Sequence, residues 1–179
     1  MVIQTSFELL SLCSEDLPVF KRDMQEAFQK GAEVEFPDLK AEILPESHID
    51  KSLRSKGAVA YKAIVDGQMA GGAVVAIDEG GRRGHLDFLY VRYGLQGKGI
   101  GQKIWQAIEK NYPDVVVWET ATPYFEKRNI HFYINLCGFS AVEFFNPHHK
   151  DPHFLNDMEG GDYFFRFEKK MKQKYVSKK

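Results

Sequence analysis

Three alternating glycines mark the point at which a strand-type pattern changes into a helical one. The segment Gln96-Gly97-Lys98-Gly99-Ile100-Gly101 follows the apolar run HLDFLYVR at 85–92 and precedes an apolar stripe at helical spacing. After Pro113, the run DVVVWET has the poor alternation of a strand that is covered on both faces. A helix between two such strands is the usual connection of a parallel pair. The pattern therefore predicts one β-α-β unit, with a strand at 85–92, a helix at 99–111 and a strand at 115–120.

The rest of the chain predicts antiparallel strands and further helices around this unit. The dipeptide Asp66-Gly67 between two apolar runs is a strong hairpin signal, Ser14 stands at a capping position, and Gly138 suits a helix end. The expected strands lie at about 3–10, 58–65, 68–77, 85–92, 115–120, 139–145 and 162–170, and the expected helices at 14–30, 46–55, 99–111 and 126–137. The predicted fold is α/β, with a mixed, mostly antiparallel sheet and one parallel pair.

The composition favours a single domain over residues 1–179. Hydrophobic residues make up 44% of the 179 residues, charged residues 27%, and no linker-like stretch divides the chain. Six lysines make the last eleven residues basic, and we expect this tail to fray from about residue 170. With 24 basic and 25 acidic side chains, the net charge of −1 points away from nucleic acid and membrane surfaces.

Three further observations bear on the cellular compartment. Cys13 and Cys137 are too few for a disulfide framework, which fits a reducing cytoplasm. The first sixteen residues lack a basic segment, and Gln4, Thr5 and Glu8 are among the polar residues that interrupt their apolar run, so no signal peptide is expected. No apolar run approaches the roughly 18 residues that a membrane-spanning helix needs.

Glycines at the start of a helix leave backbone N–H groups open to an anion, and the helix dipole favours negative charge there. The segment nevertheless fails two familiar phosphate motifs. A Walker loop needs Ser or Thr after Gly-Lys, where this chain has Gly99. A dinucleotide fingerprint needs a glycine at position 102, which is Gln102, although Glu119 does end the next strand, as a ribose-binding acid would.

The pattern Gln-x-x-Gly-x-Gly after Leu-Tyr-Val resembles the acetyl-CoA loop of the GNAT superfamily of N-acetyltransferases. The segment RNIHFYINLCGF at 128–139 and the order of elements are similar to that family too, so the resemblance covers nearly the whole chain. It implies a fold that splays open between strands 85–92 and 115–120, with helices on both faces of the sheet. Acetyl-CoA, as co-substrate, would lie in the resulting cleft.

The resemblance also implies roles for particular residues. Tyr133 matches the tyrosine that protonates the departing thiolate, although five residues separate it from Gly138 where many members have four; a core tyrosine is the alternative. The residues implied to hold acetyl-CoA are Leu89, Tyr90, Val91, Gln96, Gly97, Lys98, Gly99, Ile100, Gly101 and Asn129.

The acceptor amine must also lose a proton, so a base is needed. His85 and Asp87 alternate along one strand and should share a face, and Glu119 ends the neighbouring strand. Glu33 and Glu35 lie where the family places its substrate-binding segments. Glu119 is favoured as the base because its strand end opens into the cleft, with Asp87 as the further candidate.

The polar loop around His148, His149 and His153 lacks a second ligand cluster at structural spacing, so no metal is expected. The leading hypothesis is an acetyl-CoA-dependent N-acetyltransferase that acts on a primary amine of a small molecule or peptide, with a homodimer allowed by the resemblance. A non-catalytic CoA-binding sensor or scaffold is the alternative. A phosphate-dependent nucleic-acid module is disfavoured because the folded part lacks a basic stripe.

Overall fold

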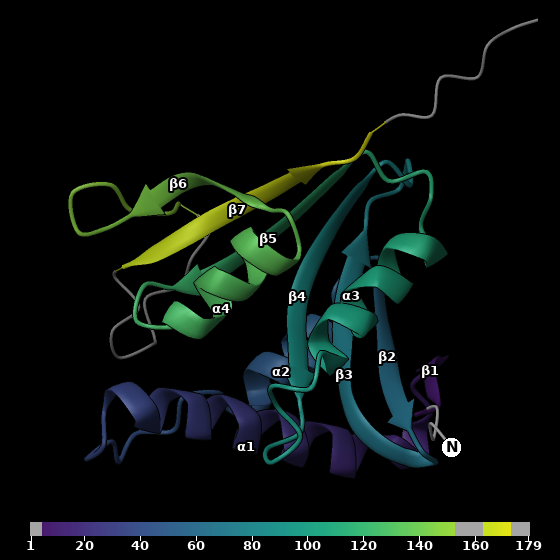
Figure 1. Ribbon diagram of the computed structural model, residues 1–179. Coiled ribbons are helices and arrows are strands. Elements are labelled where there is room, and N and C mark those ends of the chain that lie inside the picture. Colours follow the sequence, from purple (N-terminus) through teal and green to yellow (C-terminus); the bar gives the residue numbers. More distant parts are fainter. Residues whose placement is uncertain (1–4, 153–162, 173–179) are drawn as a thin grey trace, which may run out of the picture.

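In the part of the chain that the structure describes, seven strands form one sheet in the order β1-β2-β3-β4-β5-β7-β6 (Figure 1). The computed structural model describes residues 5–152 and 163–172. The strands are β1 (Phe7–Ser11), β2 (Ala58–Val65), β3 (Gln68–Ile77), β4 (Arg83–Val91), β5 (Val117–Pro123), β6 (Ser140–Phe145) and β7 (Phe164–Lys170). The helices are η1 (Ser14–Asp16), α1 (Leu17–Glu35), α2 (Glu46–Leu53), α3 (Ile100–Asn111), α4 (Lys127–His131) and the π-helix η2 (Phe132–Leu136).

Helices cover both faces of the sheet because the strands and helices carry apolar side chains toward each other. On one face Phe20 and Met24 of α1 pack with Ile49 of α2 and Val74 of β3. On the other face the apolar stripe of α3 packs on the sheet around Trp118 of β5. Every paired strand is antiparallel to its neighbour except β4 and β5, which confirms the predicted mixed sheet with one parallel pair.

The parallel strands β4 and β5 are paired only over their first residues. The register runs from Arg83 opposite Val117 to His85 opposite Glu119, after which the two strands diverge (Figure 1). Just beyond this point Asp87 is an extra residue in β4, because Leu86 and Phe88 face adjacent residues of β3. Such a β-bulge bends its strand and increases the twist. The sheet therefore forks at the bulge, and the fork positions the site described below.

Local details differ from the sequence-based expectations at helix ends. The N-cap of the first helical turn is Cys13 rather than Ser14, because the Asp16 carboxylate accepts a hydrogen bond from the Cys13 N–H at 2.9 Å. The helix expected at about 126–137 is divided into α4 and the π-helix η2. Within residues 5–152 and 163–172, no helix is long and apolar enough to cross a membrane. The basic tail lies mostly outside the described residues, which end at Lys172.

Candidate active site

A cavity of about 540 Å³ opens between α1, the end of β4, the β4–α3 loop and the α4–η2 segment. In the view of Figure 1, α1 runs along the lower side of the molecule and α4 lies above it. The lining residues include Ala27, Phe28, Gly31, Leu89, Tyr90, Val91, Gln96, Gly97, Gly99, Ile100, Gly101, Glu126, Asn129 and Tyr133. Every residue that the resemblance assigned to acetyl-CoA lies on this cavity except Lys98, whose side chain is exposed beside it.

The β4–α3 loop brings the N-terminus of α3 to the cavity. Gly97 and Gly99 have φ angles of +79° and +76°, which a residue with a Cβ adopts only under strain. Gly99 is the N-cap of α3, and no side chain among the described residues caps the helix. The first-turn N–H groups are therefore left to solvent or to an anion, and the helix dipole favours the anion. A hydrogen bond connects the loop to β4, because Gln96 Nε2 donates to the Val91 carbonyl at 3.4 Å.

The end of β4 presents a free backbone edge to the same cavity. Leu89 and Val91 pair with Ala73 and Gly71 of β3 along one edge of the strand. Toward β5, the ladder among the described residues stops at His85. Apart from the Val91 carbonyl, which accepts the hydrogen bond from Gln96, the backbone donors and acceptors in this gap suit the amide groups of an extended ligand.

The π-helix η2 places Tyr133 on the wall of the cavity. The Cys137 N–H donates to the Phe132 carbonyl at 3.0 Å, a bond that spans five residues and accommodates one residue more than an α-turn. This wider turn accommodates the one residue by which the spacing from Tyr133 to Gly138 exceeds the spacing of four that many family members have. The Tyr133 side chain is 7% exposed. Burial raises its pKa, so the phenol is protonated at neutral pH, and the neighbouring Thr120 opposes that effect only in part.

The acidic candidates on β4 and β5 lie outside the cavity lining and are engaged by partners. Asp87 accepts hydrogen bonds from Ser52 Oγ of α2 and from His85 Nδ1, the latter at 2.5 Å. His85 and Asp87 thus contact each other, as their alternation suggested. Glu119 Oε1 accepts from Arg83 Nη2 at 2.8 Å and from Arg166 Nη1 at 3.2 Å.

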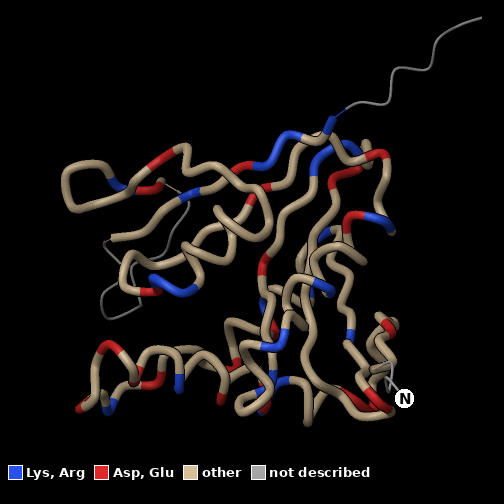
Figure 2. The backbone as a smooth tube through the Cα atoms, viewed as in Figure 1, with Lys and Arg blue, Asp and Glu red and all other residues tan. Residues whose placement is uncertain are grey.

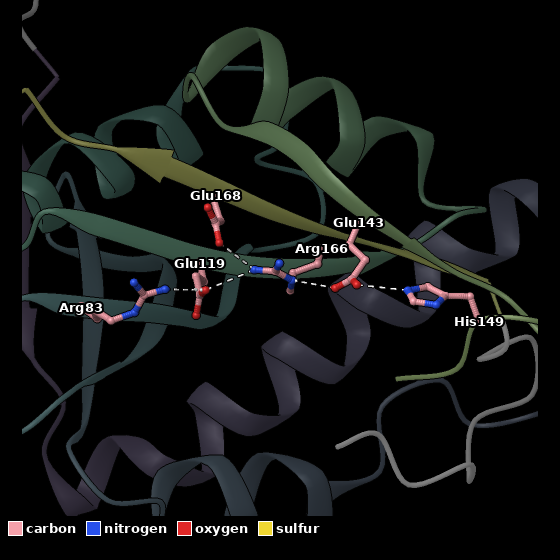
Figure 3. Close-up of polar contacts among 6 residues, drawn as sticks. All are labelled: Arg83, Glu119, Glu143, His149, Arg166 and Glu168. Carbon is pink, nitrogen blue, oxygen red and sulfur yellow. Dashed lines mark hydrogen bonds and ion pairs between the residues drawn. The ribbon is translucent and has the colours of Figure 1, made fainter. Parts of the chain in front are cut away.

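Glu119 is one member of a charged network across β4, β5, β7 and β6. Figure 3 shows this network, which consists of Arg83, Glu119, Glu143, His149, Arg166 and Glu168. Hydrogen bonds from His149 and Arg166 hold the pKa of Glu143 below its ordinary value. Sequence reasoning did not anticipate the network because Arg166 and its partners are brought together only by strand pairing.

Sequence reasoning also missed a buried carboxyl group on the cavity wall. Glu126, the residue before α4, is 8% exposed, and burial raises its pKa from 4.5 to about 7. Its two oxygens lie 3.6 and 3.7 Å from the point that a Cβ on Gly31 of α1 would occupy, so the missing side chain makes room for the carboxyl. The one sequence signal was the position of Glu126, one turn before Asn129 in the α4 motif.

The glutamates of α1 that sequence reasoning considered lie away from the cavity lining. Glu33 pairs with Lys30 at 2.8 Å along the helix, and Glu35 pairs with Lys127 of α4 at 3.5 Å. Together with the ring contact of Phe36 and Phe125, whose centroids are 5.2 Å apart, the second pair joins the end of α1 to the start of α4. This junction holds the two walls of the cavity together.

Comparison with known proteins places these features in a family. Residues 20–139 match the acetyltransferase (GNAT) family model, which confirms the resemblance inferred from the sequence. Bacillus subtilis YrkN, described as an uncharacterized protein, is 45% identical over 179 residues, covering 93% of this chain and 95% of YrkN.

Two solved structures have a similar fold at low identity. The Escherichia coli ribosomal-protein-S18-alanine N-acetyltransferase has a TM-score of 0.70 at 14% identity, covering 97% of this chain and 99% of its own. The Thermoplasma acidophilum PaiA N-acetyltransferase, solved in complex with coenzyme A, has a TM-score of 0.65 at 19% identity, covering 93% of this chain and 99% of its own.

Proposed function

Because the chain belongs to the GNAT family of acetyltransferases, we propose that it transfers the acetyl group of acetyl-CoA to a primary amine of a small molecule or peptide. The observation that carries the proposal is the cavity, which combines an uncapped helix N-terminus, a free strand edge and a buried phenol. These features meet three needs of the reaction, namely anchoring of a pyrophosphate, alignment of a pantetheine arm and donation of a proton. The similarity to two N-acetyltransferases supports nitrogen as the acceptor atom.

Different residues along the cavity would bind different parts of acetyl-CoA. Backbone N–H groups from Gln96 to Gly101 would bind the pyrophosphate, and the β4 edge at Leu89–Val91 would bind the pantetheine and the acetyl group. Asn129 of α4 would contact the cofactor from the opposite wall. In the ternary complex the neutral amine attacks the thioester carbonyl carbon, the C–S bond breaks, and Tyr133 protonates the departing thiolate.

The alternative is a CoA-binding module without catalysis. It requires the glycine loop and the β4 edge but gives no role to a phenol held protonated on the cavity wall. A nucleic-acid module has less support, since Figure 2 shows Lys and Arg interspersed with Asp and Glu along the described elements. We propose that residues 1–179 act as one domain without a metal. The two free cysteines, Cys13 and Cys137, suit a cytoplasmic protein.

A thiol-release screen tests the proposal directly. The purified chain is mixed with acetyl-CoA and a panel of amino acids, polyamines, aminoglycosides, peptide N-termini and lysine peptides, and free CoA is measured. We expect amine-dependent thiol release for at least one class, and calorimetric binding of acetyl-CoA without any amine. Binding without release across the panel would favour the non-catalytic module, and the absence of binding would contradict both.

A further inference from the structure

The Glu126 carboxyl group is a largely buried polar group on the cavity wall. In residues 5–152 and 163–172, neither a hydrogen bond nor an ion pair engages its side chain. The carboxyl lines the cavity rather than the sealed core. Its position therefore points to a partner that enters the cavity and donates hydrogen bonds.

The charged side chains near Glu126 in the described part of the chain do not pair with its carboxyl. On its own segment, Arg128 favours the ionised form of the carboxyl, but the Arg128 side chain is exposed and forms no ion pair with it. Glu35 of α1 disfavours the ionised form of the Glu126 carboxyl, and the Lys127 ammonium forms an ion pair with Glu35.

The remaining groups on the cavity wall do not neutralise the carboxyl either. Gly31 and Ala27 of α1 carry no polar side chain, and the titratable groups of β4 and η2 that line the cavity are the phenols of Tyr90 and Tyr133. His131 of α4 lines the cavity with an exposed ring, which hydrogen-bonds Asn135 at 2.8 Å.

The N-terminus of α3 and the Glu126 carboxyl favour opposite charges, although Lys127 and Arg128 line the same wall as Glu126. The N-terminus of α3 attracts phosphate, whereas an ionised Glu126 repels it and attracts a cation. On the premise of the proposed acetyltransferase function, we propose that Glu126 binds the ammonium group of the acceptor and takes its proton. The acceptor is then a cationic amine, and the carboxyl selects it over neutral nucleophiles.

The proton transfers balance as follows. The ammonium gives one proton to the Glu126 carboxylate, and the neutral nitrogen uses its lone pair to attack the thioester carbonyl carbon. The C–S bond breaks, its electron pair stays on sulfur, and the Tyr133 hydroxyl gives the thiolate a proton. The acetylated nitrogen returns a proton to the Tyr133 oxygen directly or through water, and Glu126 releases its proton to solvent.

Asp87 and Glu119 are less suited to this role because they are already occupied. Protonation of Glu119 would weaken its ion pairs with Arg83 and Arg166. Protonation of Asp87 would disturb hydrogen bonds from two side chains. Glu126 loses no such bond when it is protonated. Its pKa of about 7 also matches what general base catalysis requires near neutral pH.

The test uses the full chain, acetyl-CoA and an amine identified by thiol release. Glu126→Gln preserves shape and removes the charge, and Glu79→Gln makes the same charge change in the exposed β3–β4 turn as a control. We expect Glu126→Gln to lower kcat/KM for the amine by about 10²-fold or more. Acetyl-CoA affinity measured by calorimetry should remain within about threefold of the parent. The control should leave both quantities unchanged.

The pH profile of the unmodified chain is a second readout that needs no variant. We expect kcat/KM for the amine to rise with pH through about 7, as Glu126 ionises, and this limb to be absent in Glu126→Gln. Activity of Glu126→Gln within about threefold of the parent, or a loss confined to acetyl-CoA affinity, would overturn the inference alone. A parent chain that releases no thiol with any amine would overturn the proposed function and this inference with it.

Discussion

Tyr133 lies among the rings of Phe139 and Phe167, with centroid distances of 5.7 and 5.9 Å, so its ring is packed independently of its hydroxyl. Tyr133→Phe should therefore keep the fold and the affinity for acetyl-CoA. Loss of the proton donor should lower kcat and kcat/KM together by about 10², the low end for general acid catalysis, because water can also protonate a thiolate. Steady-state kinetics with a verified amine measure this loss. Turnover within about threefold of the parent, with chemistry rate-limiting, would make Tyr133 a packing residue.

The buried carboxyl of Glu126 should make stability depend on pH. Its pKa is about 7 in the folded chain against an ordinary 4.5, so the folded state binds more protons between these values. The free energy of unfolding should therefore fall as pH rises through 7, by up to about 3 kcal/mol at ~1.4 kcal/mol per pKa unit. Urea denaturation at about pH 5 and pH 8 should show this loss in the parent and not in Glu126→Gln. Glu79→Gln should retain it, and an equal loss in Glu126→Gln would contradict the assignment.

At the scale of elements, the N-terminus of α3 carries the phosphate site. A Cβ at Gly99 would meet no atom of the described residues within 4 Å. A side chain at this position is therefore disfavoured by the backbone φ of +76° and by contact with any ligand in the cavity. Gly99→Val should lower acetyl-CoA affinity more than tenfold, about 1.4 kcal/mol, as measured by calorimetry. Gly81→Val is the matched control, since Gly81 has a φ of +67° and equal space in a distant turn. Equal affinity of the two folded variants would refute the phosphate site.

The fork of β4 and β5 depends on a close approach of the two strands. A Cβ on Gly84 would overlap the indole ring of Trp118, which is fully buried and held by Trp105 at a centroid distance of 5.2 Å. Gly84→Ala should therefore destabilise the fold by about 1–3 kcal/mol, the usual cost of overpacking. Chemical denaturation measures it, with Gly80→Ala in an exposed turn as the control. A change below about 0.5 kcal/mol for Gly84→Ala would show that the fork tolerates the extra methyl group.

At the scale of the whole molecule, the histidine loop should stabilise the fold without a metal. His149 stacks on Phe145 with centroids 5.4 Å apart and pairs with Glu143 at 3.0 Å. Residues 5–152 and 163–172 hold no group of three metal-ligating side chains, and His153 lies outside them. A chelator should leave melting temperature and activity unchanged, with metal-saturated chelator as the control. A lower melting temperature on chelation, restored by added metal, would contradict this expectation.

The order of elements and the glycine loop follow from the sequence because each depends on neighbours along the chain. Apolar periodicity distinguishes strands from helices within a few residues. The Asp66-Gly67 turn of the predicted hairpin and the helix that begins after Gly99 occur as predicted. The loop motif and the segment around Tyr133 were also enough to identify the family, since they are short and contiguous.

Only the tertiary structure decides where the strands separate and which carboxyl groups are engaged. The bulge at Asp87 arises from the register of β4 against β3, which no local pattern encodes. Glu119 is paired by Arg166, 47 residues away, whereas Glu126 is buried against α1 and has no hydrogen-bond or ion-pair partner among residues 5–152 and 163–172. The availability of a carboxyl to a ligand is set by its burial and by its long-range neighbours, because these determine the cost of moving its charge. The sequence alone could therefore name Glu119 and Asp87 as candidate acids, but it could show neither that both are engaged by other side chains nor that Glu126 is the carboxyl on the cavity wall.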